Sequence, residues 1–387
     1  MRAHDQLPTI ELRISRTSPH PWIYRKMIRP IRGIPIGAFV EIVDKTGAFV
    51  GRGFYNSKSE IELRVLTTDP AEDKLETIFE NRLRKALDLR ERVLNLGAYT
   101  DAYRLVHAES DGLSGLVADR YGGHIVVQAF SAGIHRYRDL LRRVIMRLVP
   151  DVTVHVRADE TVQKREGFEL EPEPSGPDIE IHEGAVKFHV SLAGQKTGFF
   201  LDQRDNRRWV GEMAAGRTVL DLCCYTGGFS LHAGKGGAAQ VTAVDLDESA
   251  LAIGAKNARL NGLDIKFVKA NIFEYLRALP PSEQYDLVVL DPAKQARVRE
   301  EVPKAMKAYN DMNRLALQHL KPGGVLLTCS CSGLISEQVF LSLLKNGAME
   351  AQCDLDILGI HGAAPDHPVA LHCPETRYLK AVRAVKR

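Results

Sequence analysis

The stretch TVLDLCCYTGGFSLHAGKGGAAQVTAVD, from Thr218 to Asp245, predicts the architecture on which the chain is built. It opens with an apolar run typical of a buried parallel strand, which meets a small-residue turn at Tyr225–Gly228 and then an apolar helix. Backbone amides at the start of such a helix can face a ligand. A second apolar run ends on Asp245, as in nucleotide-type half-sites whose second-strand acid accepts ribose hydroxyls.

The turn does not carry the G-x-G-x-x-G pattern of a dinucleotide site, because Asp221 stands where the first glycine would be. An acid at a strand end would repel phosphates but suits an ammonium group, such as that of the methionine end of S-adenosylmethionine. The alternative is a purely structural turn of a doubly wound sheet. The turn therefore favours a ligand that carries an ammonium group over a pyrophosphate.

Helix and strand signals keep alternating after this stretch, which predicts an α/β domain with a doubly wound, Rossmann-like sheet. The expected elements are a helix at 248–261, strands at 265–268 and 285–290, a helix at 305–320, a turn at 322–324 and a strand at 325–328. Ligands of an open parallel sheet lie beyond the carboxyl ends of its strands. Five residues lie at such ends: Asp221, Asp245, Asn271, Asp291 and Cys331.

Composition limits the other possibilities. A chain of 387 residues suggests two or three domains. The six cysteines are too sparse for a disulfide framework, and the absence of a C-x-x-C pair argues against zinc, so we expect free thiols and no metal. The sequence shows neither a membrane-length apolar run nor a signal peptide, which predicts a cytoplasmic protein without a membrane partner.

The N-terminal 35 residues are locally basic although the net charge of the chain is only +3. The basic residues are Arg2, Arg13, Arg16, Arg25, Lys26, Arg29 and Arg32, against two acids. His20, Trp22 and Tyr24 are interleaved with them, and such rings can lie on bases. Trp22 and Arg25 are therefore candidates for RNA contact, the alternative being a solvated basic face over core aromatics.

Three domains are expected. Alternating residues at 38–66 predict a small β-barrel in domain 1–70. A long amphipathic helix at 72–96 begins a central α+β domain, 71–184. This domain continues with strands at 115–119, 125–130 and 152–156 and a helix at 137–148. The Rossmann-like domain takes the remainder, 185–387.

Several ordered motifs together resemble the RlmI-type methyltransferases, bacterial S-adenosylmethionine-dependent enzymes that make 5-methylcytosine in large-subunit ribosomal RNA. The principal matches are GQKTGFFLDQRDNRR at 194–208, the turn at 225–229, Asp291–Pro292 with Lys294, and Cys331–Gly333. Shorter matches occur at 20–22, 109–113 and 366–368. The resemblance covers nearly the whole chain.

The resemblance implies an N-terminal PUA-type RNA-binding barrel, a central α+β domain and a class I methyltransferase domain. It implies ribosomal RNA as partner and leaves a homodimer open. The cofactor residues that it implies are Phe200, Gln203, Asp221, Tyr225, Thr226, Gly227, Asp245, Asn271 and Asp291. The chain departs from the family pattern at Ala270–Asn271, where two acids are common, but an asparagine can both accept from and donate to adenine.

The resemblance also implies that Cys331 is the nucleophile. Carbon 5 of cytosine is a poor nucleophile until a thiolate adds at carbon 6, and a base must afterwards remove the carbon 5 proton. Asp291 would orient the base, with Pro292 and Lys294 beside it, although Ala293 replaces a second proline of the family. The alternative is that Cys331 is an inert buried thiol, and Cys329 is a secondary candidate.

Other readings stay open. The proton-removing base is Asp291 or a water, and Glu109, Asp111 and His367 could be structural. Lys196 and Arg204 could contact a phosphate or pair with Asp202 or Asp205. The runner-up functions are a guanine N2 methyltransferase, whose motif would place an aromatic at Lys294, and a non-catalytic RNA-binding assembly factor.

Overall fold

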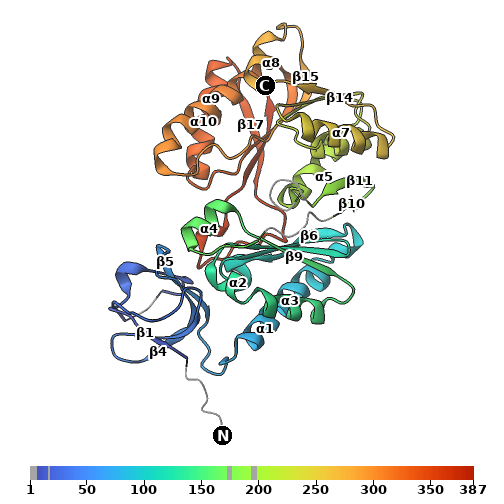
Figure 1. The fold of residues 1–387 in the computed structure, drawn as a ribbon. Helices are drawn as coiled ribbons and strands as arrows, with labels where there is room; N and C mark the ends of the chain where they lie inside the picture. Colours follow the sequence, from blue (N-terminus) through green and yellow to red (C-terminus); the bar gives the residue numbers. More distant parts are fainter. Residues whose placement is uncertain (1–6, 16–17, 172–176, 193–197) are drawn as a thin grey trace. The chain divides into compact units, whose positions relative to one another are not determined.

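The computed structural model describes all of the chain except residues 1–6, 16–17, 172–176 and 193–197 (Figure 1). Its contacts divide the chain into two compact units. The first unit contains residues 1–181, 190–201 and 365–376, and the second contains 182–189, 202–364 and 377–387. Within the described ranges, no helix is long and apolar enough to cross a membrane.

The first unit begins with the barrel sheet, whose strand order is β1-β3-β4-β5-β2. The strands are β1 (Thr9–Glu11), β2 (Trp22–Tyr24), β3 (Phe39–Val43), β4 (Phe49–Tyr55) and β5 (Ile61–Thr67). Ile10, Val40 and Leu63 are completely buried in its core. The expected hairpin strands are present, and the basic N-terminal segment supplies two further strands, β1 and β2.

The central part of this unit is a four-stranded sheet in the order β6-β7-β8-β9, with helices packed on it (Figure 1). Its elements are α1 (Leu75–Asp88), β6 (Ala102–His107), β7 (Leu116–Tyr121), β8 (His124–Ala129), α2 (Ala132–Arg136), α3 (Arg138–Leu148), β9 (Thr153–Arg157) and α4 (Glu160–Glu166). The helix expected at 72–96 begins at Leu75. Its regular α-helical part ends at Asp88, and a wider helical turn, Leu89–Val93, follows it.

The barrel has its own core but also contributes residues, among them Phe54, to the apolar core of the central sheet. The ring of Phe54 packs edge-on against Phe79 and stacks on Tyr137. The backbone at Gly133 passes so close to Phe54 that a Cβ there would lie 2.1 Å from the ring. This packing explains why both parts fall in one compact unit, while the division into three domains stays a prediction.

The second unit is a seven-stranded sheet in the order β14-β13-β12-β15-β16-β18-β17. Its strands are β12 (Thr218–Leu222), β13 (Gln240–Asp245), β14 (Lys266–Lys269), β15 (Tyr285–Leu290), β16 (Leu320–Ser330), β17 (Leu355–His361) and β18 (Lys380–Lys386). The first five are parallel, and β18 runs antiparallel between β16 and β17. The strand order therefore reverses between β12 and β15, where an open sheet forms its ligand crevice.

Helices accompany the sheet, and a short ribbon precedes it. These elements are β10 (Asp178–Glu183), β11 (Val186–Ser191), α5 (Arg204–Met213), α6 (Gly228–Lys235), α7 (Glu248–Leu260), α8 (Ile272–Ala278), α9 (Val302–Gln318) and α10 (Glu337–Glu350). The expected alternation of helix and strand is confirmed. One difference is that β16 begins at Leu320, which pairs with Tyr285, so the expected turn at 322–324 is a bulge within this strand.

Candidate active site

The turn after β12 holds an unusual backbone. Cys223 and Tyr225 have φ angles of 61° and 51°, in the left-handed region that non-glycine residues rarely adopt, and Gly227 has φ 80°. The amide of Tyr225 donates a hydrogen bond of 2.8 Å to Oδ2 of Asp245, at the end of β13. Such backbone strain persists where neighbouring groups enforce it, commonly at ligand sites.

Asp221 is a fully buried carboxyl group on β12. Its Oδ2 accepts hydrogen bonds from the amide and the hydroxyl of Ser230, at 3.0 and 2.6 Å, and so anchors α6. Oδ1 is buried and has no hydrogen-bond partner among the described residues. Burial raises the pKa of Asp221 to about 7. An ammonium group of a ligand would satisfy the unpaired oxygen and favour the carboxylate.

Asp245 is the last residue of β13, and Asn271 follows the neighbouring parallel strand β14. Oδ1 of Asp245 accepts a hydrogen bond from the amide of Asp247 at 2.9 Å. Asn271 caps α8, since its Oδ1 accepts from the amide of Phe273 at 2.9 Å. Because Asp245 pairs with Lys269 in register, Asp245 and Asn271 lie at the same edge of the sheet, as expected.

The Asp291 loop and the Cys331 segment are held together by one hydroxyl group. Oγ of Ser332 accepts hydrogen bonds from the amides of Gln295 and Ala296, at 3.1 and 3.3 Å. The hydroxyl of Tyr309, on α9, lies 3.1 Å from Oγ of Ser332. The loop after β15 is thereby fixed beside the residues that follow β16.

This arrangement brings Cys331 to the Asp291–Pro292 backbone. Sγ of Cys331 lies 4.0 Å from the carbonyl oxygen of Pro292. The amide of Asp291 donates to the carbonyl of Leu222 at 3.3 Å, which joins the same loop to the end of β12. Lys294, in the same loop, is exposed. The expected strand-end residues thus converge on one edge of the sheet.

The cysteines differ in accessibility. Cys331 is half-buried, just past the end of β16. Cys329 is completely buried, and burial raises the pKa of its thiol well above the ordinary value. Burial likewise raises the pKa of Cys223 and Cys224, in agreement with a packing role. The structure therefore favours Cys331 over Cys329 as a reactive thiol.

The candidate residues of the GQKTGFFLDQRDNRR motif do not all lie in the same part of the structure. Gln203 is buried, and its Oε1 accepts from Nδ2 of Asn206 at 2.7 Å. Arg204 is buried with its Nε 4.0 Å from Glu183, a partner that the sequence did not predict. Phe200 belongs to the first unit, so its place in a cofactor pocket stays a prediction. Lys196 lies outside the described residues.

The candidate RNA contacts in the barrel take part in internal hydrogen bonds. Nε1 of Trp22 donates to Glu109 at 3.0 Å, so Glu109 has a structural partner. Arg25 donates to the carbonyl oxygens of Ser57 and Ser59, at 2.8 and 3.1 Å, yet half of its side chain is exposed. Arg25 can therefore still reach a ligand, whereas the indole N–H of Trp22 already donates a hydrogen bond within the protein.

Asp111 and His367 lie in the first unit and also have protein partners. Asp111 forms an ion pair with the buried Arg90 at 2.6 Å. The ring of His367 packs edge-on against His107 and lies beside Asp366. These contacts support the structural reading of both residues.

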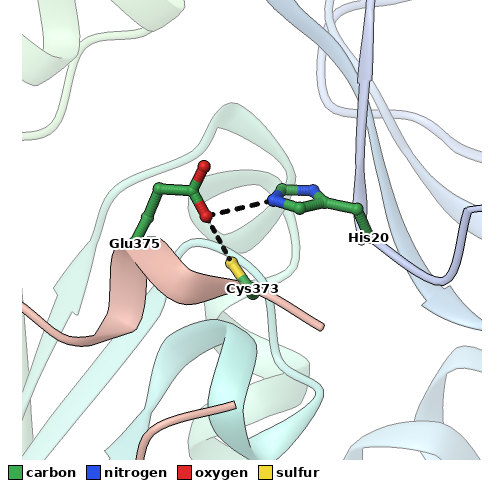
Figure 2. A group of neighbouring side chains, drawn as sticks. All are labelled: His20, Cys373 and Glu375. Carbon is green, nitrogen blue, oxygen red and sulfur yellow. Dashed lines mark hydrogen bonds and ion pairs between the residues drawn. The ribbon is translucent and has the colours of Figure 1, made fainter. Parts of the chain in front are cut away.

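His20, Cys373 and Glu375 form a cluster that the sequence did not predict (Figure 2). The amide of Trp22 donates to Nδ1 of His20 at 3.1 Å, so the ring proton of a neutral His20 belongs on Nε2, which donates to Glu375 at 3.2 Å. The Cys373 thiol, whose pKa burial raises to about 12, donates to the same carboxylate at 3.5 Å. These three side chains therefore form one hydrogen-bonded cluster, centred on the Glu375 carboxylate.

The parallel sheet, its acidic strand ends and its strained turn define the class: a Rossmann-like S-adenosylmethionine-dependent methyltransferase. A family profile for an S-adenosylmethionine-dependent methyltransferase matches residues 169–369, and one for a PUA-like domain matches residues 17–68. The chain is 40% identical over 375 residues to the ribosomal RNA large subunit methyltransferase I of Aeromonas hydrophila, covering 94% of each chain. It is 40% identical over 381 residues to the Tolumonas auensis protein of the same name, covering 95% of this chain and 96% of the relative. The chain belongs to the ribosomal RNA large subunit methyltransferase I family.

Solved structures agree on the fold. A crystal structure of a candidate methyltransferase complexed with SAH superposes with a TM-score of 0.81 at 22% identity, covering 95% of this chain and 96% of that one. A candidate S-adenosylmethionine-dependent methyltransferase from Streptococcus mutans gives a TM-score of 0.80 at 21% identity, covering 98% and 100%. At these identities the likeness concerns the fold, and it extends over both units.

Proposed function

We propose that this protein methylates carbon 5 of a cytosine in large-subunit ribosomal RNA and that Cys331 forms a covalent adduct with the base. The relatives named as ribosomal RNA large subunit methyltransferase I support the RNA substrate. The observation that carries the cytosine chemistry is the half-buried Sγ of Cys331, 4.0 Å from the Pro292 carbonyl in the loop that begins at Asp291. A nucleophile and a base-orienting acid thus share one edge of the sheet.

In this mechanism the Cys331 thiolate adds to carbon 6, and the electrons of the C5–C6 double bond make carbon 5 nucleophilic. Carbon 5 would then take the methyl group of S-adenosylmethionine, whose S–CH3 bond breaks so that SAH leaves. Asp291 holds the ring through its exocyclic amine or nitrogen 3. Loss of the carbon 5 proton to Asp291 or to a water re-forms the double bond and expels the Cys331 thiolate. Cys331 is therefore a free thiolate again at the end of the cycle.

The acids and the strained turn fit the cofactor. Asp221, with Tyr225, Thr226 and Gly227, would hold the methionine part. Oδ1 of Asp221 has no hydrogen-bond partner in the described part of the chain, which supports this assignment. Asp245 would accept the ribose hydroxyls while Oδ2 still holds the turn. The remaining assignments are Asn271 for adenine, Gln203 for the wall of the cofactor pocket, and Pro292 and Lys294 for the base.

The test is transfer of labelled methyl from S-adenosylmethionine to unmodified large-subunit ribosomal RNA, followed by nucleoside identification. We expect label in 5-methylcytidine with the wild type and none with Cys331→Ala, because the alanine cannot add to carbon 6. Cys353→Ala, which removes another half-buried thiol, is the matched control and should retain the label. Label in another nucleoside, or activity that survives Cys331→Ala, would overturn the cysteine mechanism and favour methylation of an exocyclic amine.

A further inference from the structure

Lys380 opens β18, the antiparallel strand that lies beside β16. In the register of this pair Lys380 faces Ser330, the residue before Cys331. The Lys380 side chain is 4% exposed. Its Nζ donates to the carbonyl oxygen of Ser332 at 2.7 Å and to that of Tyr378 at 2.9 Å. The ammonium group therefore hydrogen-bonds to the backbone of the residue immediately after Cys331.

The charge of Lys380 is not neutralised by a carboxylate. Among the ion pairs of the described residues, none includes Lys380, whereas a buried ammonium is normally paired. Burial lowers the pKa of Lys380 to about 8, and the Cys331 thiolate opposes that shift. The other charges that act on Lys380 are Lys294 and Arg377, which repel it, and Glu337, which attracts it.

We propose that Lys380 is a positioning residue for the nucleophile: its ammonium fixes the backbone after Cys331 and stabilises the Cys331 thiolate. The attraction is mutual, so a cation that the thiolate keeps charged also increases the thiolate fraction near neutral pH. The proposal rests on the proposed function, in which this thiolate attacks carbon 6. The thiolate is also the group expelled in the last step, so the same ammonium assists both addition and release.

Lys386, a second lysine on the same strand, offers a matched comparison. Nζ of Lys386, at the other end of β18, donates to the carbonyl oxygens of Leu317 and Leu320, both at 2.7 Å. Lys386 acts on a different thiol, because its charge lowers the pKa of Cys353, which burial raises. If both lysines only tie down backbone, removing either one should have the same kind of effect on the fold and no selective effect on Cys331.

The experiment measures the iodoacetamide alkylation rate of Cys331 and of Cys353 in the full chain, peptide by peptide, by mass spectrometry from about pH 6 to about pH 9. Lys380→Met should slow alkylation of Cys331 about tenfold at neutral pH, which corresponds to a rise of one pKa unit. Lys380→Arg should restore most of the rate, since it keeps a cation at this position. Lys386→Met should slow Cys353 and leave Cys331 unchanged.

SAH affinity and circular dichroism show that each variant keeps its fold. The proposal is overturned if Lys380→Met leaves the alkylation of Cys331 unchanged, or if Lys386→Met slows Cys331 to the same extent. Methyl transfer separates this result from the proposed function. If Cys331→Ala abolishes methylation while Lys380→Met leaves Cys331 alkylation intact, only the role of Lys380 fails. If Cys331→Ala retains methylation, the proposed function fails whatever the alkylation shows.

Discussion

Asp221 combines complete burial with one carboxylate oxygen that lacks a hydrogen-bond partner among the described residues. Its pKa of about 7 in the folded protein, above the ordinary 3.8, has a defined consequence. Between these two pH values the folded state binds a proton that the unfolded state does not, so the contribution of Asp221 to stability falls as the pH rises. A cationic ligand group beside Oδ1 would reverse this preference by favouring the carboxylate.

We therefore predict that SAH, which carries the same ammonium group as S-adenosylmethionine, binds more tightly as the pH rises through 7. Asp221→Asn should weaken binding at about pH 8 by about tenfold or more and remove this pH dependence, because a charge-assisted hydrogen bond is lost. Calorimetric titration over this pH range is the measurement. Asp286→Asn is the control, since Asp286 lies at the opposite end of β15, paired with Lys321. An unchanged pH profile in Asp221→Asn would exclude the contact.

The sequence could predict the site residues at the ends of the parallel strands, but not those that come from other elements. Asp221 lies near the end of an apolar run, Asp291 and Cys331 come just after such runs, and the ends of parallel strands must meet at one edge. Lys380 and Tyr309 reach the same place from an antiparallel strand and a helix. Their positions depend on the sheet order, for which neither residue carries a local signal.

At the scale of elements, Glu183 joins β10 to two helices. It pairs with Arg207 of α5 at 2.5 Å and with His232 of α6 at 3.2 Å, and all three side chains are buried. Burial alone would raise the pKa of Glu183, but Arg207 and His232 outweigh it and hold the pKa at about 2. The stabilisation is therefore complete above the ordinary pKa of 4.5 and is lost as the pH falls from there through about 2.

Glu183→Gln should lower the free energy of unfolding of the second unit by about 3–5 kcal/mol, because it leaves a buried arginine without its counter-charge. The chain has two tryptophans, so in a Trp22→Phe background the fluorescence of Trp209 on α5 follows this unit during urea unfolding. The control is Glu212→Gln, whose ion pair with Arg208 is exposed and should contribute about 0–1 kcal/mol. Equal effects of the two changes would contradict a structural role of the buried pair.

Strands could be predicted from the sequence where they are long enough to show a clear pattern of apolar residues. The parallel strand Tyr285–Leu290 has the bounds that its apolar run predicts. β1 and β2 have three residues each, too few for alternation to be visible. In β17 the side chains of Ile357 and Leu358 are both exposed at the edge of the sheet, so polarity there does not report burial. Short or edge strands are specified by their partners rather than by their own sequence.

At the scale of the whole molecule, the residues proposed for RNA contact and those proposed for the chemistry of the base lie in different units. The strand-end acids and Cys331 belong to the second unit, whereas the barrel, which matches a PUA-like domain, belongs to the first. On the barrel segment Tyr24, Lys26 and Arg32 are exposed. Cations on a surface with an exposed ring fit a single-stranded RNA backbone, whose binding releases counterions.

We predict that Lys26→Gln with Arg32→Gln weakens binding of unmodified ribosomal RNA and reduces the slope of log affinity against log salt by about 1.4, since each lost phosphate contact contributes about 0.7. SAH affinity and the rate at saturating RNA should be unchanged, so the loss appears in KM and not in kcat. Lys164→Gln with Arg165→Gln removes the same charge from exposed positions on α4 and is the matched control. If both double variants change the slope equally, the effect is one of net charge and the barrel holds no specific RNA contact. If neither changes it, RNA is bound without this face of the barrel.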